Sequence, residues 1–383
     1  MQSYQYYPVI IQIGARFIRA GFAGDATPIL RTPTNAYDLS DSQLNNNIEF
    51  KHALPEKDHI QKQDGLENNY LWTYDLTEFN AAKLECLLER IIYDIYQRNL
   101  LVDAKKCKVL VLEPPLFPIP LKKIIAKVFL FHIHAQSLRF YPEPVLSCVS
   151  AGSSSGLVID LGWNQTTVIP IFDLRMMYKD IKVSCKAGRQ LHEYVRDKLK
   201  EFESWAEVDS FSMTEKLICD TFYCRTKAIL RTDAKEFEFE NIIIPNSIRY
   251  ELLERFMFKL EDSDLDNENH QLVPMITTTL RNLPIDLRSE LSTKIIITGG
   301  LANIPGLKTR ILEEVEQSLG HPVEAIDSLG SWEGASLYCS TSLMSPSTTG
   351  SKKSDELFRD KYLNGESVVT DWTDQLYTQQ RAL

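Results

Sequence analysis

Apolar positions along the chain follow two patterns that alternate from one segment to the next. Short aliphatic runs that end near a glycine predict β-strands, whereas longer stretches with apolar residues three and four positions apart predict amphipathic helices. Residues 9–13 and 16–22 form one predicted pair of strands, and residues 157–160 and 166–172 form a second. Each half of the chain therefore opens with a strand, a glycine turn and another strand, which predicts two related α/β domains packed face to face.

Other segments extend this plan, and two polar stretches interrupt it. Helices are predicted at residues 76–99, 191–202, 213–228 and 307–319. Further strands are predicted at residues 108–112, 138–141, 295–298 and 323–326. Residues 35–69 are rich in Asn, Asp, Gln, Lys and Glu, so we expect a solvated, mobile segment there. Residues 342–356 have the composition of a linker, and Trp372 is the aromatic anchor expected in the tail.

Composition narrows the class of protein. The 383 residues are too many for one hydrophobic core and suit two domains. The net charge of −10 argues against nucleic acid or an anionic membrane as the main partner. None of the seven cysteines forms a CxxC pair, which favours free thiols in a reducing compartment over a zinc site. Without a recognisable signal peptide or an apolar run of roughly 20 residues, we expect a soluble intracellular protein.

Three glycine-bearing turns are candidates for chemistry. Two glycine turns that face each other across a cleft can bind polyphosphate through backbone N–H groups, and a carboxylate such as Asp160 can hold the waters of a magnesium ion. Those turns contain Gly14 and Gly162. A third segment, residues 295–306, runs from a buried strand through a double glycine into a helix, where a flat ring can lie against backbone. Taken singly, each turn is also typical of an ordinary structural connection.

In order and spacing, several segments resemble the actin family over nearly the whole chain. These segments are residues 20–28, 110–118 (LVLEPPLFP), 142–162, 168–172, 188–191, 298–306 and 332–336. The resemblance implies an α/β, actin-like fold, with two related domains of the actin, sugar-kinase and chaperone ATPase superfamily around a central nucleotide cleft. It places residues 1–155 and 342–383 in the first domain, with a small mobile subdomain at about 32–70, and residues 156–341 in the second.

The resemblance also implies a nucleotide site. The residues that it places in the cleft are Gly14, Arg19, Asp160, Gly162, Gly299, Gly300 and Leu301. The cofactor stays unknown: ATP or ADP held without turnover is the ligand that the resemblance offers, with Asp160 near a metal only where a magnesium nucleotide is bound. The family's glutamine that orients the attacking water falls at Glu143, and its Lys-Glu pair beside the adenosine falls near Ile218 and Cys219.

At the phosphate end of this cleft the chain departs from the actin pattern. Gln12 replaces the acid of the first hairpin, Ala15 the phosphate-capping hydroxyl and Arg16 the next glycine. In the second hairpin, Trp163 and Asn164 replace an acid and a glycine. Hydrolysis needs an in-line water and neutralised phosphate charge, so we expect no ATPase activity. Two alternatives stay open: an unhydrolysed nucleotide braces the lobes, or Arg16 takes the place of a phosphate.

Two further stretches resemble the divergent actin relatives at the pointed end of the short dynactin filament. They are residues 283–291 and the tail, at residues 358–362 and 369–372. The resemblance implies a non-enzymatic cap that binds the actin-like filament subunits of dynactin and the pointed-end accessory subunits, and through them dynein, in the cytoplasmic cytoskeleton. The polar segment 35–69 is shorter than the loop through which actin binds its next subunit, which fits a subunit that blocks growth.

Other interpretations were weighed beside this one. The alternative function is a nuclear actin-related subunit of a chromatin-remodelling complex, although no basic run suggests nuclear import. An enzyme of the wider superfamily would need the acid that Gln12 replaces, and a conventional filament-forming actin is the remaining class. His132 and His134 alternate as a metal-binding pair would, but the sequence offers no third ligand nearby, so we expect no metal site there.

Overall fold

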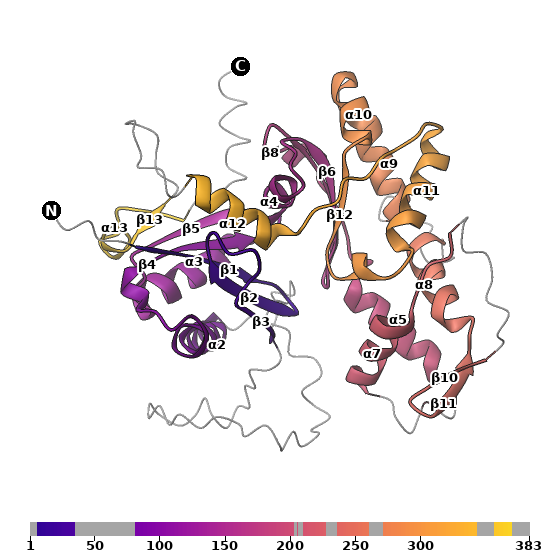
Figure 1. The fold of residues 1–383 in the computed structure, drawn as a ribbon, viewed down its shortest axis with the longest axis horizontal. Helices are drawn as coiled ribbons and strands as arrows, with labels where there is room; N and C mark the ends of the chain where they lie inside the picture. Colours follow the sequence, from indigo (N-terminus) through magenta and orange to yellow (C-terminus); the bar gives the residue numbers. More distant parts are fainter. Residues whose placement is uncertain are drawn as a thin grey trace.

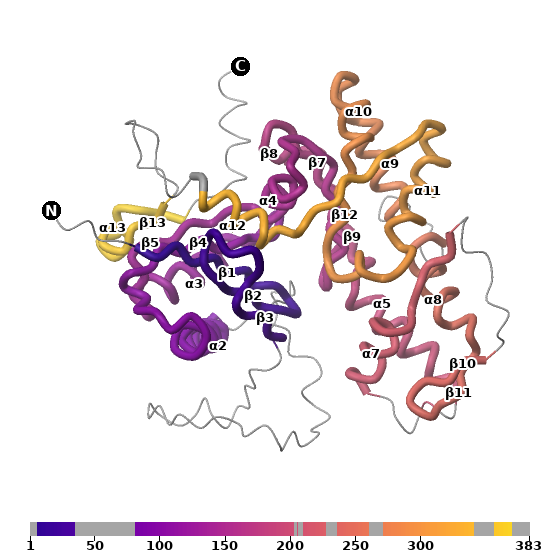
Figure 2. Tube along the Cα trace, in the orientation of Figure 1, coloured from indigo at the N-terminus to yellow at the C-terminus, as the bar shows by residue number. Residues whose placement is uncertain are grey.

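The computed structural model describes residues 6–34, 81–202, 205, 210–226, 236–259, 271–342 and 356–369. Figure 1 shows two lobes side by side, each with a sheet and its own helices. Figure 2 follows the chain from the first lobe into the second and back to the first. The predicted mobile segment 35–69 and Trp372 lie outside the described residues. In the part of the chain that is described, no helix is both long and apolar enough to cross a bilayer.

The first lobe is built on a six-stranded sheet, ordered β13-β5-β4-β1-β2-β3. Its strands are β1 (Tyr7–Ile13), β2 (Phe17–Phe22), β3 (Leu30–Pro33), β4 (Cys107–Glu113), β5 (Ser137–Pro142) and β13 (Leu357–Phe358). β1 pairs in parallel with β4 and antiparallel with β2, as the predicted hairpin requires, and this register sets Gln12 opposite Arg19. β13 comes from the far end of the chain and closes the sheet edge at β5.

Helices cover both faces of the first sheet. They are α2 (Ala81–Asp94), α3 (Ile119–Lys127), α4 (Glu143–Ser150) and α12 (Ser331–Ser342). Successive residues of a strand point to opposite faces. Val9 and Ile11 are therefore buried in the cluster that contains α2 and α3, whereas Ile10 is buried with Leu146 of α4 and Trp332 of α12. A strand that is apolar on both faces fits this sandwiched position.

The second lobe contains a sheet ordered β12-β6-β7-β8, with β9 also paired to β7. Its strands are β6 (Gly156–Leu161), β7 (Thr166–Phe172), β8 (Arg175–Met176), β9 (Lys182–Ser184) and β12 (Ile295–Thr298). Its helices include α5 (Gly188–Leu199), α7 (Phe211–Thr221), α8 (Ile248–Phe258), α9 (Leu272–Asn282), α10 (Ile285–Ser292) and α11 (Leu307–Leu319). β6 and β7 form the second predicted hairpin, and β12 runs parallel to β6 with Thr298 opposite Asp160.

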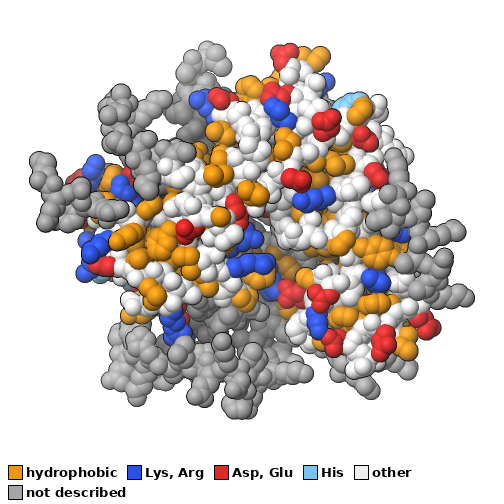
Figure 3. Space-filling view, in the orientation of Figure 1, with side chains coloured by type: hydrophobic (Ala, Val, Ile, Leu, Met, Phe, Trp, Pro, Cys, Tyr) orange, Lys and Arg blue, Asp and Glu red, His pale blue; other side chains and the backbone are white. Residues whose placement is uncertain are grey.

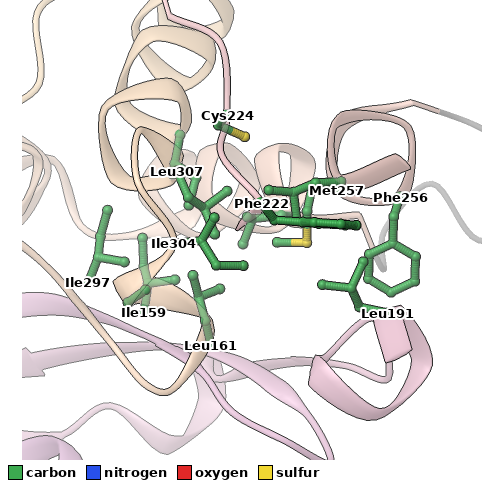
Figure 4. Packing of buried hydrophobic residues seen from close by; sticks show 14 of the residues in the cluster. Ile159, Leu161, Leu191, Phe222, Cys224, Phe256, Met257, Ile297, Ile304 and Leu307 are labelled. Atoms are coloured by element: carbon green, nitrogen blue, oxygen red, sulfur yellow. The ribbon is translucent and has the colours of Figure 1, made fainter. Parts of the chain in front are cut away.

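One face of the second sheet supports a large hydrophobic core. Ile159, Leu161 and Ile297 leave the strands on this face and join Leu191 of α5 and Leu307 of α11. Figure 4 shows these side chains gathered between the sheet and the helices. Burial of apolar surface contributes about 25 cal/mol per Å², so this core is the main support of the lobe. It holds the end of β6, and with it Asp160, in a fixed place.

Helix α4 lies between the two sheets and contacts both. Leu146 packs into the cluster of the first sheet, whereas Val145 and Cys148 pack against Val158 and Ile296 of the second. A helix that is apolar on opposite sides can serve two layers in this way. The lobes therefore share a buried structural element.

Helix α12 packs with the first lobe, although it lies within residues 156–341, the range predicted for the second domain. Trp332 is fully buried near Ile10 and donates a hydrogen bond from Nε1 to the Ile10 carbonyl oxygen at 3.4 Å. Gly334 lets the helix approach α4 so closely that an added Cβ would lie 1.9 Å from the Leu146 carbonyl oxygen. The chain thus re-enters the first lobe before this helix begins.

Several local elements differ from the sequence prediction. The strand predicted at 323–326 makes a single bridge, from Ala325 to Ile295. The helix predicted at 213–228 ends at Thr221, because the chain beyond it is extended and the Cys224 N–H donates to the Pro305 carbonyl oxygen at 2.8 Å. The structure also contains elements that the hydrophobic pattern does not predict: the hairpin of β10 (Glu236–Phe239) and β11 (Ile242–Pro245), and helices α8 and α10.

Candidate functional site

Each of the two predicted hairpins is closed by its glycine. The Gly14 N–H donates to the Phe17 carbonyl oxygen at 3.0 Å, and a Cβ on Gly14 would lie 2.8 Å from that oxygen. The Gly162 N–H donates to the Gln165 carbonyl oxygen at 3.2 Å, and a Cβ there would also lie 2.8 Å from its oxygen. Close backbone approach is sufficient to require both glycines, whether or not a phosphate lies nearby.

Gln12, which stands where the actin pattern has an acid, connects β1 to β2, α4 and α12. Its Nε2 donates to Glu143 Oε1 at 3.0 Å and to Ser331 Oγ at 3.0 Å. Its Oε1 accepts a hydrogen bond from Arg19 Nη1 at 3.2 Å. Nε2 therefore already serves two acceptors and the amide oxygen one donor. Arg19, which the resemblance placed in the nucleotide cleft, is held here by a neutral side chain.

The third predicted turn meets the end of β6. Gly299 has a φ of +97°, and a Cβ on it would lie 2.4 Å from the Leu161 carbonyl oxygen and 2.6 Å from Asp160 Oδ1. Only glycine suits such a position. Gly300, in contrast, has helical backbone and no atom within 4 Å of an added Cβ, and Leu301 is half-buried. The structure thus brings Gly299 against Asp160 and leaves Gly300 beside open space.

Two carboxyl groups at the cleft have raised pKa values. Burial is the largest cause for Glu143, and the nearby Asp160 carboxylate adds to it, so the pKa of Glu143 rises to about 7. The hydrogen bond from Gln12 and the charge of Arg19 oppose this rise. Burial raises the pKa of Asp160 to about 6. Glu143 belongs to the shared helix α4 and Asp160 to the second lobe, so the repulsion between them acts across the boundary.

The raised pKa of Glu143 predicts a pH dependence of stability. The folded state holds this proton more tightly than the unfolded state, so the free energy of unfolding falls as the pH rises from about 4.5 to about 7. Glu143→Gln keeps an acceptor for Gln12 and removes the charge. We expect the free energy of unfolding of the variant to be about 1–2 kcal/mol higher than that of the wild type at pH 8, and equal to it near pH 4.5. The value at pH 8 is reduced for the solvent contact that Glu143 keeps.

Urea unfolding at pH 4.5, 6.5 and 8 would measure this difference. Glu193→Gln is the matched control, because Glu193 is an exposed partner of Arg189. Its effect should be small at every pH. If Glu143→Gln raised the free energy of unfolding by the same amount at all three pH values, the electrostatic explanation would be wrong.

Trp163 forms part of an aromatic box on the second lobe, which we define as Trp163, His192, Phe211 and Glu215. Trp163 lies edge-on to His192 at 6.1 Å and to Phe211 at 5.9 Å between ring centroids. The His192 and Phe211 rings stack at 4.1 Å. Burial lowers the pKa of His192, which favours the neutral ring, and its Nε2 lies 3.0 Å from the Phe211 carbonyl oxygen. The box is therefore fixed by contacts among its own members.

Arg16 crosses from the β1–β2 turn of the first lobe into this box. Its guanidinium carbon lies 4.7 Å from the Trp163 ring centroid and 4.9 Å from that of Phe211. Its Nη2 forms an ion pair with Glu215, and only 10% of the Arg16 side chain is exposed. Figure 3 shows basic and acidic side chains gathered where the two lobes meet. Protein groups therefore bridge the lobes at the tips of the two hairpins.

Glu215 is absent from the predicted site, whose adenosine contacts lie near Ile218 and Cys219. Ile218 is buried in the core of the second lobe. Cys219 is exposed one turn of helix α7 beyond Glu215, close enough for the charges of Glu215 and Arg16 to act on it. Phe211 and Glu215 are four positions apart on this helix, so they share one face, and that spacing was the available signal.

The two histidines considered as a metal pair have other partners. His132 Nε2 lies 2.7 Å from Glu85 Oε1, and its Nδ1 lies 3.3 Å from Glu89 Oε2. His134 Nδ1 lies 3.2 Å from Arg359 Nη2, and burial, together with this cation, lowers the pKa of His134. Among the residues with described positions, no cluster of His, Cys, Asp and Glu is arranged to hold a metal ion.

Comparison with known proteins agrees with the fold and with the order of the cleft segments. The chain matches the sequence profile of the family described as Actin over residues 4–237 and 233–354. It is also similar to actin-related protein 2 of Saccharomyces cerevisiae, with 22% identity over 335 residues that cover 81% of each chain. The profile spans both hairpins, the shared helix α4 and the Gly299 turn. The chain therefore belongs to the actin family, and its two lobes have the actin-like α/β fold.

Proposed function

We propose that the chain is a non-enzymatic structural subunit that caps the pointed end of the actin-like filament of dynactin. In this proposal it belongs to the divergent subgroup called actin-related protein ten, or eleven in another naming. It binds the last filament subunit on one side and the pointed-end accessory subunits on the other. It thereby supports dynein-driven transport along microtubules in the cytoplasm.

The bridge from Arg16 to the aromatic box is the observation that carries this proposal. It joins the lobes through protein groups alone, with no nucleotide as part of the contact. A subunit that is added once, at the end of a filament, has no need to change shape through a cycle of hydrolysis. A fixed arrangement of the lobes suits that position better than it suits a subunit that exchanges.

We also propose that the chain does not hydrolyse ATP. Hydrolysis needs a positioned water and a metal that neutralises phosphate charge. On the first-lobe side, the position nearest such a metal is the neutral Gln12 amide, whose Nε2 already donates to Glu143 and Ser331. On the second-lobe side, burial raises the pKa of Asp160, which disfavours the charged carboxylate that a metal needs. These residues fit a magnesium triphosphate poorly, and no catalytic step is assigned to them.

The segments that resemble the pointed-end relatives offer surfaces for partners. Helix α10 presents Ile285 to solvent with 76% of its surface exposed. The tail forms β13 and α13 (Arg359–Leu363), and Arg359 Nε donates to the Leu130 carbonyl oxygen at 3.0 Å, which fixes the tail on the first lobe. In this proposal, helix α10 and the tail are the places where partner subunits bind.

Isolation of the protein from its own cells under mild salt, followed by mass spectrometry of the proteins that travel with it, tests this proposal. We expect dynactin filament, shoulder and pointed-end subunits. A second assay would mix the purified chain with filaments of the dynactin actin relative, where we expect one copy per filament and loss of growth at the pointed end. Recovery of remodeller subunits and histones would overturn the proposal in favour of a nuclear role.

Self-association separates a cap from an ordinary filament subunit. We expect the purified chain to remain unpolymerised at concentrations where actin forms filaments, with or without magnesium ATP. Sedimentation of the protein as filaments on its own, or no binding to the dynactin filament, would contradict the capping function.

A further inference from the structure

We propose that the aromatic box is a guanidinium-binding site whose resident ligand is Arg16, so that the chain closes its own cleft with an arginine from the opposite lobe. The inference goes beyond the proposed function, because it concerns how the lobes are held and does not depend on which assembly contains the chain.

The box is held together by contacts within the second lobe. Its members come from three elements of the second lobe: the β6–β7 turn, α5 and α7. Trp163 lies against the start of α5, where a Cβ on Gly188 would be 2.9 Å from its Cε3 atom. The Arg189 N–H donates to the Trp163 carbonyl oxygen at 2.8 Å. These contacts hold the indole in place without any help from the first lobe.

The chemistry of the box selects a planar cation. The guanidinium carbon of Arg16 is less than 5 Å from the centroids of two aromatic rings, and a carboxylate pairs with its Nη2. Guanidinium is weakly hydrated and stacks on aromatic faces, whereas an ammonium is compact and strongly hydrated. The Glu215 carboxylate offsets the loss of solvent around the largely buried Arg16 side chain. The box therefore favours arginine over lysine.

The turn that carries Arg16 is also fixed. Thr34 at the end of β3 donates from its N–H to the Arg16 carbonyl oxygen at 2.9 Å and from its Oγ1 to the Ala15 carbonyl oxygen at 2.8 Å. The Gly14 to Phe17 hydrogen bond closes the same turn. A separation of the lobes that exceeds the reach of the Arg16 side chain must therefore withdraw the guanidinium from the box. This makes the contact a latch between the lobes.

Chemical rescue provides a direct test in the full-length protein. The chain would be labelled with 5-fluorotryptophan, and the ¹⁹F resonance of Trp163 would be assigned by its loss in Trp163→Phe. In Arg16→Ala we expect this resonance to shift and the melting temperature to fall by about 5 °C. Millimolar ethylguanidinium should then return the resonance toward its wild-type position and restore part of the melting temperature.

The controls separate guanidinium recognition from general effects. Ethylurea has a similar shape without charge, and ethylammonium has charge without the planar group, so neither should restore the resonance at the same concentration. Arg255→Ala, which removes an exposed arginine of α8 paired with Glu251, should leave the Trp163 resonance and the melting temperature close to wild type. In the wild type, where Arg16 fills the box, added ethylguanidinium should have no effect.

Two outcomes would overturn the inference. The first is an unchanged Trp163 resonance in Arg16→Ala, and the second is equal rescue by ethylurea or ethylammonium. If Arg16→Ala does not fold, the Trp163 resonance would be measured in Arg16→Lys and Glu215→Gln instead. Each weakens one part of the contact, so each should shift the same resonance by less than the full truncation. A Trp163 resonance identical to wild type in both folded variants would also reject the latch.

Discussion

Replacing Gly334 with alanine should lower the free energy of unfolding by about 3 kcal/mol. At this position α12 crosses α4 with backbone against backbone, and an added Cβ would lie 1.9 Å from the Leu146 carbonyl oxygen and 2.7 Å from its carbonyl carbon. A carbon and an oxygen cannot approach so closely, so one helix must move. Because α4 also packs against the second sheet, that movement strains both lobes.

Gly300→Ala is the matched control for this substitution. Gly300 has helical backbone, with φ −63° and ψ −43°, and no atom lies within 4 Å of an added Cβ. We expect Gly300→Ala to change the free energy of unfolding by no more than about 0.5 kcal/mol, or to raise it slightly. Urea unfolding followed by circular dichroism would measure both variants. Equal stability of Gly334→Ala and Gly300→Ala would show that the two helices do not depend on their close approach.

Lys122→Met should lower the free energy of unfolding by about 3–5 kcal/mol, because it leaves a buried carboxylate without its cationic partner. Lys122 Nζ on α3 lies 2.6 Å from Glu113 Oε2 at the end of β4, and their side chains are 3% and 4% exposed. The cationic Nζ also lies 5.8 Å from the centroid of Phe140. Methionine retains most of the side-chain volume, so the loss reports on charge rather than on a cavity.

The double variant Lys122→Met with Glu113→Gln identifies the cause. The Glu113→Gln substitution removes the negative charge from the same buried place, so we expect the double variant to recover at least half of the stability lost by Lys122→Met. Thermal and urea unfolding at pH 7 would give both values. If the single variant lost less than about 1 kcal/mol, or the second substitution recovered nothing, the pair would not be the source of the stability.

The fold was largely predictable because its hairpins repeat a local signal. Strand, glycine turn and strand are close in sequence, and the glycines at 14 and 162 are required by the hydrogen bonds that close each turn. The hairpin of β10 and β11 also left a signal. Strand β10 alternates Glu and Phe, and Glu240 and Asn241 both have positive φ in the turn, as tight hairpins favour. Strand β11, with three consecutive Ile residues, does not alternate, which weakens the signal.

The candidate site was predictable residue by residue but not in its contacts. The departures at Gln12, Arg16 and Trp163 are evident in the sequence, which leaves two roles open for the cleft. The sequence could not pair Arg16 with Glu215, because 199 positions separate them and only the packing of the β1–β2 turn against α7 brings them together. For the same reason it assigned α12 to the second domain, since Trp332 meets Ile10 across 322 positions.

The return of the chain to the first lobe affects how the protein can be synthesised. The strands β1 to β5 leave the ribosome first, but Trp332 of α12 and strand β13 complete the same lobe only after the whole second lobe has been made. During that interval β5 is an unpaired sheet edge and Ile10, Leu110 and Leu112 lack their cover. The strands and helices of the second lobe, in contrast, lie between residues 156 and 319, so its core can form earlier. Until α12 and β13 have been made, the nascent first lobe therefore exposes an edge and apolar side chains that favour aggregation.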